Sequence, residues 1–321
     1  MNKNFSLWML DYGIVLILFL LIGIFSFASS NFFSLSTLTT ILRQVSIIGI
    51  ISVGAAYVIL TAGIDLSVGS IACISSLTAA LLLKAGWSIP VTIIVTLILA
   101  TIYGVFSGCL VVFFKMSPLI ATLGVMTSLR GAGYLITDGL PVFGFGKGLS
   151  AFGRGYFLGI PDPVILMVII FALGIFILSC TPIGRYVYGV GGNEEASRLS
   201  GVSISGVKIF CYAFCAMLSG IAGLVLLSRT NSGQPAAGVG FEMDAITAVV
   251  LGGISLMGGQ GKLPLVIIGV LIMGVLSTGM LMCNINDYVQ QVVKGLVLIA
   301  AVAFSYVSTR LRDKIITKPN D

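Results

Sequence analysis

The chain has 321 residues, of which 58% are hydrophobic and only 9% are charged, and its mean hydropathy is +1.14. A soluble domain carries roughly 25% charged residues because its surface must be solvated, so this composition excludes a water-soluble protein of this size. The sequence contains no histidine, which excludes Ser-His-Asp chemistry, Cys-His nucleophile pairs and His-ligated metal sites. We therefore expect an all-α, polytopic membrane protein with a single transmembrane domain over residues 1–321.

The formal net charge of +6 does not indicate nucleic-acid binding. The largest cluster of basic residues directly follows an apolar run and consists of Arg310, Arg312, Lys314 and Lys318. Basic residues next to a membrane span mark its cytoplasmic end, so this cluster predicts a cytoplasmic C-terminus on the lipid bilayer.

Apolar runs of about 17–25 residues are typical of transmembrane helices. Ten such runs occur, at residues 12–29, 44–62, 70–83, 90–114, 119–137, 163–180, 207–227, 243–257, 264–283 and 288–308. The runs 70–83 and 243–257 are short, and glycines interrupt the second. We expect about ten transmembrane helices, with one or two broken or re-entrant helices at these short runs.

The distribution of basic residues predicts the orientation of the helices. With the N-terminus in the cytoplasm, the inner loops and tail hold ten basic residues and the outer loops hold five: inside Lys3, Lys115, Arg185, Arg198, Lys208, Lys262, Arg310, Arg312, Lys314 and Lys318, and outside Arg43, Lys84, Lys147, Arg154 and Arg229. Both termini are therefore expected in the cytoplasm, and either both short runs cross the membrane or neither does. The longest hydrophilic stretches are then an extracytoplasmic loop at 138–162 and a cytoplasmic loop at 181–206.

Ionisable residues within or between apolar runs are candidates for function because a charge is costly in hydrocarbon. They are Asp65, Arg130, Asp244 and Lys294. Arg130 either clamps a carbonyl group or an acid such as Asp244, or lines a solute path. Lys294 lies about two turns inside the last run, so it either reaches the interface or lines the path. No pair of carboxylates or Ser/Lys dyad has a spacing suited to catalysis, so we expect no catalytic residue and no enzyme activity.

Two stretches share the pattern Gly-Ile-x-Leu-x-x-Gly, at residues 63–69 and 253–259. Both indicate a break in helical backbone, and broken helices often meet at transporter substrate sites. In the first, Asp65 or Ser67 either caps the following helix or lines the path as a hinge. Gly253 and Ser255 are the corresponding candidates in the second.

The hydrophilic loop at 181–206 contains signals for a short helix. Asn193 is a good N-cap, Glu194 and Glu195 suit a first turn, and Gly201 suits a helix end. A short rigid helix at the membrane face could be gripped by a soluble motor protein; an ordinary surface loop is the alternative. The glycine-rich stretch 258–262 is no phosphate-binding loop because Leu263 replaces the required Ser or Thr, so we expect any ATP to bind on another chain.

Several motifs in one order resemble the permeases of ribose-type monosaccharide ABC importers, over almost the whole chain. The matching segments are 63–69, 120–124, 129–131, 184–186, 191–194, 198–201, 234–235, 238–240, 244–246 and 248–253. The resemblance implies a multi-pass subunit in the bacterial cytoplasmic (inner) membrane that moves ribose or a related sugar by alternating access. It also implies that 193–201 docks into an ATPase, which gives the expected coupling residues Gly192, Asn193, Glu194, Glu195, Arg198, Leu199 and Gly201.

The same resemblance implies a set of partner chains. They are ABC ATPase subunits holding ATP and magnesium, a second permease subunit that is the same or similar, and a periplasmic or lipid-anchored sugar-binding protein. We expect no cofactor and no metal on this chain.

Two alternatives remain from the residues alone: an ion-coupled secondary carrier using Asp65, Asp244 and Lys294, or a passive facilitator. Neither alternative needs a docking helix.

Overall fold

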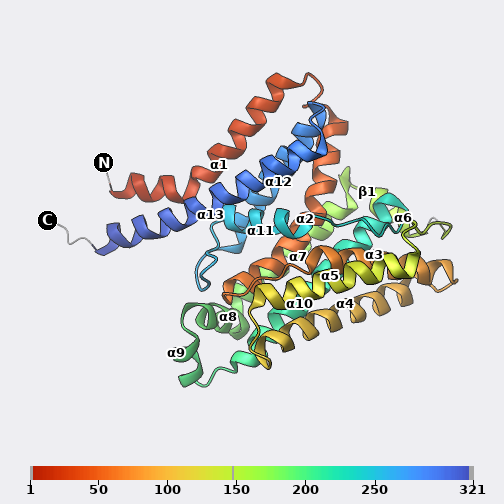
Figure 1. The fold of residues 1–321 in the computed structure, drawn as a ribbon. Coiled ribbons are helices and arrows are strands. Elements are labelled where there is room, and N and C mark those ends of the chain that lie inside the picture. The colour runs from red at the N-terminus through yellow and green to blue at the C-terminus, as the bar shows by residue number, and fades with distance from the viewer. Residues whose placement is uncertain (1–2, 147, 318–321) are drawn as a thin grey trace.

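The computed structural model describes residues 3–146 and 148–317 and is a helical bundle with one very short hairpin (Figure 1). The elements in chain order are α1 Lys3–Ala28, α2 Leu35–Leu60, α3 Val68–Lys84, α4 Ile89–Val112, α5 Pro118–Thr137, α6 Gly148–Arg154, β1 Tyr156–Phe157, β2 Ile160–Pro161, α7 Asp162–Cys180, α8 Pro182–Gly192, α9 Glu194–Leu199, α10 Ile204–Thr230, α11 Phe241–Leu251, α12 Leu263–Met282 and α13 Asp287–Thr317.

Local sequence signals explain many of the helix ends. Helices α4, α5, α7, α8 and α12 carry proline in their first or second position, where its missing N–H group is not needed. Helix α2 begins at Leu35, earlier than the predicted start at residue 44, because the Ser34 side chain caps it by accepting a hydrogen bond from the Thr37 N–H. Helices α5 and α10 end at Asp138 and Asn231, both in the left-handed conformation that these residue types tolerate.

Helix α2 lies at the centre of the bundle. Its most apolar 18-residue window is 83% buried, whereas that of α13 is 6% buried. The largest hydrophobic cluster surrounds α2 and includes residues of α7, α10, α11 and α12. Tyr57 of α2 is fully buried, and its hydroxyl donates a 2.7 Å hydrogen bond to the Gly174 carbonyl of α7. The other membrane helices therefore pack around α2. A displacement of the end of α2 would move the helices that pack against it.

Each of the ten predicted apolar runs overlaps a helix, and the short run 70–83 lies within the unbroken α3. Seven of the described helices are long and apolar enough to cross a membrane, while Gly13–Ala28 and Val68–Lys84 are shorter apolar segments. Helix α11 has only 11 residues and stops at Leu251, so a non-helical loop ends the run 243–257. The predicted break in this run is present.

The two long hydrophilic stretches contain more structure than the sequence indicated. The segment 138–162 holds α6 and an antiparallel hairpin that pairs Tyr156 with Pro161 and Phe157 with Ile160; these two-residue strands are a minor exception in an otherwise helical architecture. The segment 181–206 holds α8 as well as α9. Figure 1 shows the start of α1 and the end of α13 toward the same end of the bundle as α8 and α9, and α6 and β1 toward the other. Lys147 and Lys318 lie outside the described residues.

Helices α4 and α10 pack closely through glycine. A Cβ atom on Gly104 would overlap the Tyr212 carbonyl oxygen and the Ala216 side chain, and one on Gly108 would lie 3.0 Å from Ile209 Cα. Small residues allow this approach of backbones, which supplies much of the association energy of helices in lipid. In contrast, a Cβ on Gly124 of α5 would meet no atom within 4 Å.

We predict that Gly104→Ala lowers the free energy of unfolding by about 1–3 kcal/mol, because the added methyl group forces α4 and α10 apart. The measurement is thermal unfolding of the detergent-solubilised protein. Gly124→Ala is the matched control, and its melting temperature should stay constant or rise, since alanine favours a helix by roughly 0.5–1 kcal/mol over glycine. Equal melting temperatures for the two variants would contradict the close packing of α4 on α10.

Candidate functional site

The residues expected to couple to an ATPase lie on α9 and its two flanks. The Asn193 side-chain oxygen accepts a 2.9 Å hydrogen bond from the Ala196 N–H, which caps the helix, and Glu194 and Glu195 occupy its first turn. Gly201 has a φ of +82° and its N–H donates to the Arg198 carbonyl, so the chain turns away there. Gly192, Asn193, Glu194, Glu195, Arg198, Leu199 and Gly201 are all exposed. Together they form a rigid and accessible projection.

Ion pairs and one exposed leucine define the surface of α9. Glu194 pairs with Lys208 of α10 at 2.6 Å, which ties α9 to a long membrane helix. Glu195 pairs with Arg198 at 2.6 Å along the helix, with both side chains largely exposed, so this pair adds little stability. Leu199 is 80% exposed. The apolar Leu199 side chain is therefore open to solvent beside charged residues.

Three backbone segments meet at the end of α8, just before α9, at a contact that we call the glycine junction: Leu60 at the end of α2, Gly191 near the end of α8, and Gly258 and Gly259 in the α11–α12 loop. The Gly259 N–H donates a 2.9 Å hydrogen bond to the Leu60 carbonyl. A Cβ on Gly191 would overlap that carbonyl oxygen and lie 2.6 Å from the Gly259 nitrogen, and one on Gly258 would lie 2.7 Å from the Ala62 nitrogen. Only glycine fits at these close approaches.

A tyrosine strengthens the same junction. The Tyr188 hydroxyl of α8 donates a 2.9 Å hydrogen bond to the Gly261 carbonyl in the α11–α12 loop. Burial raises the pKa of the Tyr188 phenol, so the group keeps its proton and remains a donor. Helix α8, which runs directly into α9, is thus fastened to the α11–α12 loop by a side chain as well as by backbone.

The two similar motifs form the α2–α3 and α11–α12 loops, and these loops touch at Ala62 and Gly258. In the second loop Gly253 has a φ of +81°, a conformation that favours glycine, and the buried Ser255 hydroxyl accepts a hydrogen bond from the Met257 N–H. The structure thus brings Gly253 and Ser255 into the same region as the first motif. The sequence alone could not show that the motifs meet.

Asp65 stabilises the α2–α3 loop from within. Its Oδ1 accepts a 2.8 Å hydrogen bond from the Ser67 N–H and a 2.5 Å bond from the Ser67 hydroxyl, while Oδ2 has no hydrogen-bond partner among the described residues. Of the two residues expected to cap α3, Ser67 occupies the N-cap position but makes no side-chain cap bond, and the Asp65 carboxylate binds Ser67 itself. Thr122 of α5 and Tyr212 of α10 bond to the loop backbone at residues 64–66. The loop is therefore held by two membrane helices.

Arg130 binds backbone and does not pair with Asp244. One guanidinium nitrogen donates to the carbonyls of Ala237 at 2.5 Å and Pro235 at 3.5 Å, in the non-helical segment between α10 and α11. Of the two clamping partners expected from the sequence, the structure selects the carbonyl. Arginine does not lose its proton, so Arg130 remains a hydrogen-bond donor, and here it holds the 231–240 segment against α5.

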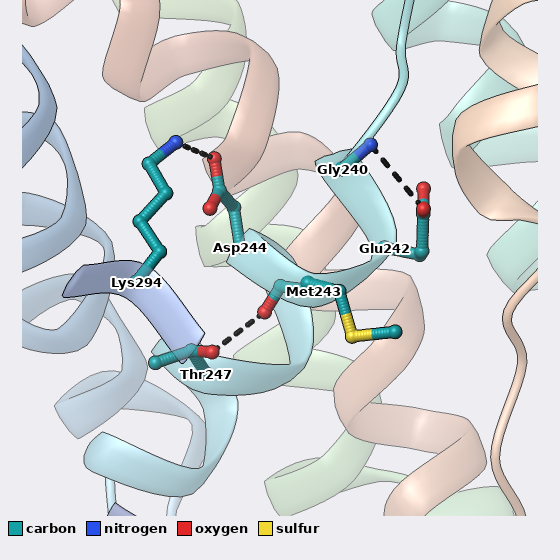
Figure 2. Close-up of polar contacts among 6 residues, drawn as sticks. All are labelled: Gly240, Glu242, Met243, Asp244, Thr247 and Lys294. Carbon is teal, nitrogen blue, oxygen red and sulfur yellow. Dashed lines mark hydrogen bonds and ion pairs between the residues drawn. The ribbon is translucent and has the colours of Figure 1, made fainter. Parts of the chain in front are cut away.

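Asp244 pairs with Lys294, as Figure 2 shows. Lys294 Nζ of α13 lies 2.7 Å from Asp244 Oδ2 in the first turn of α11, and the two side chains are 24% and 11% exposed. Lys294 therefore does not extend to the interface. Glu242 lies on a different side of the same turn, with Oε1 accepting a hydrogen bond from the Gly240 N–H (Figure 2). Glu242 is 8% exposed. The sequence did not indicate this burial, because a polar, glycine-rich segment precedes the residue.

A helical bundle with several apolar membrane-length helices and a capped, exposed helix beside a glycine junction is the architecture of a polytopic membrane permease. The comparisons with known proteins agree. Residues 37–302 match the model of the family described as branched-chain amino acid transport system / permease component. The chain belongs to this family, and it is a multi-pass permease subunit of an ABC import system in the bacterial inner membrane.

Relatives of known name cover nearly the whole chain. It is 43% identical to the ribose import permease protein RbsC of Haemophilus influenzae over 96% of this chain and 98% of the relative. Identity to the ribose import permease protein RbsC of Bacillus subtilis is 44%, over 89% of each chain. The D-allose transport system permease protein AlsC of Escherichia coli is 34% identical, over 94% of this chain and 93% of the relative. No solved structure matches the chain.

The glycine junction predicts a sharp difference between Gly191 and a helix glycine outside the junction. Gly191→Ala should reduce transport-coupled ATP hydrolysis about tenfold or more, because the added methyl group overlaps the Leu60 carbonyl and overpacking of this kind costs roughly 1–3 kcal/mol. Gly124→Ala in α5 should behave as wild type, since its Cβ would meet no atom within 4 Å. The rates are measured on the reconstituted complex, after membrane insertion is checked by solubilised yield. Indistinguishable rates for the two variants would rule out the junction as a functional contact.

The Asp244–Lys294 pair predicts strong coupling in a double-mutant cycle. Asp244→Asn or Lys294→Met should each lower the free energy of unfolding by about 3 kcal/mol, because each leaves an uncompensated, largely buried charge or dipole. The double variant should lose less than the sum of the two single losses. Thermal unfolding of the purified protein provides all four values, and strict additivity would show that the pair contributes nothing.

Proposed function

We propose that this permease imports a monosaccharide, with ribose as the first candidate, by alternating access driven by a separate ATPase. Relatives that cover most of the chain are named for ribose, D-allose and L-arabinose, which are all monosaccharides. Burying an unpaired hydroxyl in hydrocarbon costs roughly 4–8 kcal/mol, so a sugar needs a polar route across the bilayer. The buried polar residues of the α2–α3 loop and of the first turn of α11 are suited to such a route.

The topology proposed for this function has ten crossings with both termini in the cytoplasm. The excess of basic residues in the inner loops supports it, as does the common position of α8, α9, the start of α1 and the end of α13 in Figure 1. Helix α11 has 11 residues and is about 16 Å long, whereas the hydrocarbon core of a bilayer is roughly 30 Å thick. In the proposed topology the turn-rich 231–240 segment, which Arg130 clamps, accounts for the rest of this crossing.

Partner chains complete the proposed importer. The ATPase subunits hold ATP and magnesium and receive α9 in a cleft, while a second permease subunit, the same or similar, forms the other half of the membrane domain. A periplasmic or lipid-anchored sugar-binding protein delivers and selects the sugar. The path through this chain must bind the sugar weakly enough to release it. Selection of the sugar by the binding protein is consistent with such weak binding.

An ion-coupled carrier would use Asp65, Asp244 and Lys294 as coupling sites. The paired state of Asp244 and Lys294 speaks against this, because each charge already neutralises the other at 2.7 Å. The observation that most supports the ATP-driven mechanism is the preorganised helix α9, capped by Asn193 and tied to α10 through Lys208. A facilitator has no need of such a projection.

The test is uptake of labelled ribose into proteoliposomes that contain the permease, its ATPase and its binding protein. Uptake should require ATP, the ATPase and the binding protein, and ribose-loaded binding protein should stimulate ATP hydrolysis. Ribose entry that continues normally without the ATPase would overturn the ATP-driven mechanism. ATP-dependent uptake of D-allose or L-arabinose, but not of ribose, would retain the mechanism and reassign the substrate.

We further predict that Leu199→Asp abolishes ATP-driven uptake without reducing membrane insertion. Leu199 is 80% exposed on α9, so the substitution leaves the fold intact, whereas a carboxylate in the apolar centre of a protein interface costs several kcal/mol. Leu199→Met is the control and should retain uptake, because methionine has a similar size and polarity. Co-purification of the ATPase with each variant measures docking directly; normal co-purification of the Leu199→Asp variant would place the contact elsewhere.

A further inference from the structure

A cavity of about 360 Å³ lies between α2, α10, α11 and α13. Its rim includes the exposed Thr230 at the end of α10 and Val239, and its floor includes the buried Ile47 and Asp244. Small-molecule sites in proteins have volumes of about 300–1,000 Å³, so this cavity can hold one small solute. A second, water-sized space continues beyond Asp244 toward Ser277 of α12.

Two of the polar side chains that line the cavity hold no other part of the described fold. The Gln44 amide and the Arg229 guanidinium make no side-chain hydrogen bond to any described residue, although neither residue is fully exposed. In the described part of the chain, neither side chain has a fully buried, unpartnered polar atom, so both polar groups are accessible where they line the cavity. Water or a polar solute in the cavity would satisfy both groups.

The apolar part of the wall suits a sugar as well. Ile47, Ile48, Leu226 and Phe241 face the cavity, and Phe241 belongs to the same helical turn as Asp244. A monosaccharide has hydroxyl edges and apolar C–H faces, so it matches a wall with few polar groups on an apolar background. The amide of Gln44 both donates and accepts hydrogen bonds, as a hydroxyl does.

We propose that this cavity is a subsite within one permease subunit that binds a single uncharged monosaccharide in transit. Gln44 and Arg229 contact the hydroxyl groups, Phe241 packs against a C–H face, and the Asp244–Lys294 pair forms the charged wall. The proposal rests on the import function above and adds a binding position to it. None of these contacts was expected from the sequence except that Asp244 and Lys294 line the path.

The charges at the cavity wall leave an anion such as phosphate as the competing occupant, because the Arg43 guanidinium lies near that of Arg229. Lys294 Nζ is already paired with Asp244 Oδ2 at 2.7 Å, and the Asp244 carboxylate would repel an anion. Arg229 is then the one cation lining the cavity that lacks a paired acid among the described residues. A single guanidinium can serve as a donor to hydroxyl groups.

The experiment measures whether sugar protects a thiol at the rim of the cavity. Thr230→Cys is labelled with a membrane-impermeant maleimide in the reconstituted complex, and D-ribose is added at increasing concentration. Leu158→Cys, 87% exposed in the hairpin turn, is the control outside the cavity, and the protein without either substitution corrects for native thiols. Ribose should slow labelling at position 230 and leave labelling at position 158 unchanged.

A second variant tests the assigned contact. Gln44→Leu in the Thr230→Cys protein should require three- to tenfold more ribose for equal protection, which corresponds to the loss of one hydrogen bond. Unchanged labelling without sugar would show that the variant is folded. No protection by ribose, or protection by inorganic phosphate in its place, overturns the subsite. The import function fails separately, by absence of ATP-dependent ribose uptake in the unsubstituted complex.

Discussion

The glycine junction is the contact on which the rest of this structure depends. At Leu60, Gly191 and Gly259, the end of the central helix α2, the end of α8 and the α11–α12 loop lie in backbone contact, with one hydrogen bond between Gly259 and Leu60. Side chains yield by rotating, but backbones in direct contact cannot. A displacement of α8 must therefore be passed to both loops that interrupt the membrane helices.

This constraint connects the exposed end of the molecule to its polar interior. Helix α9 follows α8 after a single residue, Asn193, and the Glu194–Lys208 pair joins it to α10. Through the α11–α12 loop, motion reaches α11, whose first turn carries Asp244 and borders the cavity. Helix α13 contacts that turn through Lys294. The polar groups of the interior thus lie one short helix away from the junction, an arrangement suited to opening and closing a solute path.

Much of this fold follows from local sequence. The apolar runs predicted the membrane helices, and Asn193 with Glu194 and Glu195 predicted α9, because capping and the helix dipole act within one turn. Helix α8 was missed because Gly184, Gly189 and Gly191 are poor helix formers, and tertiary packing overrides that preference. The hairpin in 138–162 was missed because two-residue strands leave almost no periodic pattern.

The site was less predictable, because its contacts join distant parts of the chain. Asp244 and Lys294 are fifty residues apart, and their spacing does not show which of several acids the lysine binds. The roles of Gln44 and Arg229 depend on a cavity formed by four helices. The approach of the two glycine motifs depends on how α2 and α11 pack. The sequence could identify the rare polar residues, but only the arrangement of helices shows which of them meet.

The most direct test of this account is a set of spin-label distances through the ATPase cycle. Labels replace the exposed Ser200, directly after α9, and Met257 in the α11–α12 loop, with a third at Leu158 in the hairpin, in a protein whose six cysteines are replaced by alanine. Backbone contact at the junction predicts that the 200–257 distance is the same with and without ATP, while both distances to 158 change together. A 200–257 distance that changes while the 257–158 distance stays constant would contradict transmission through the junction.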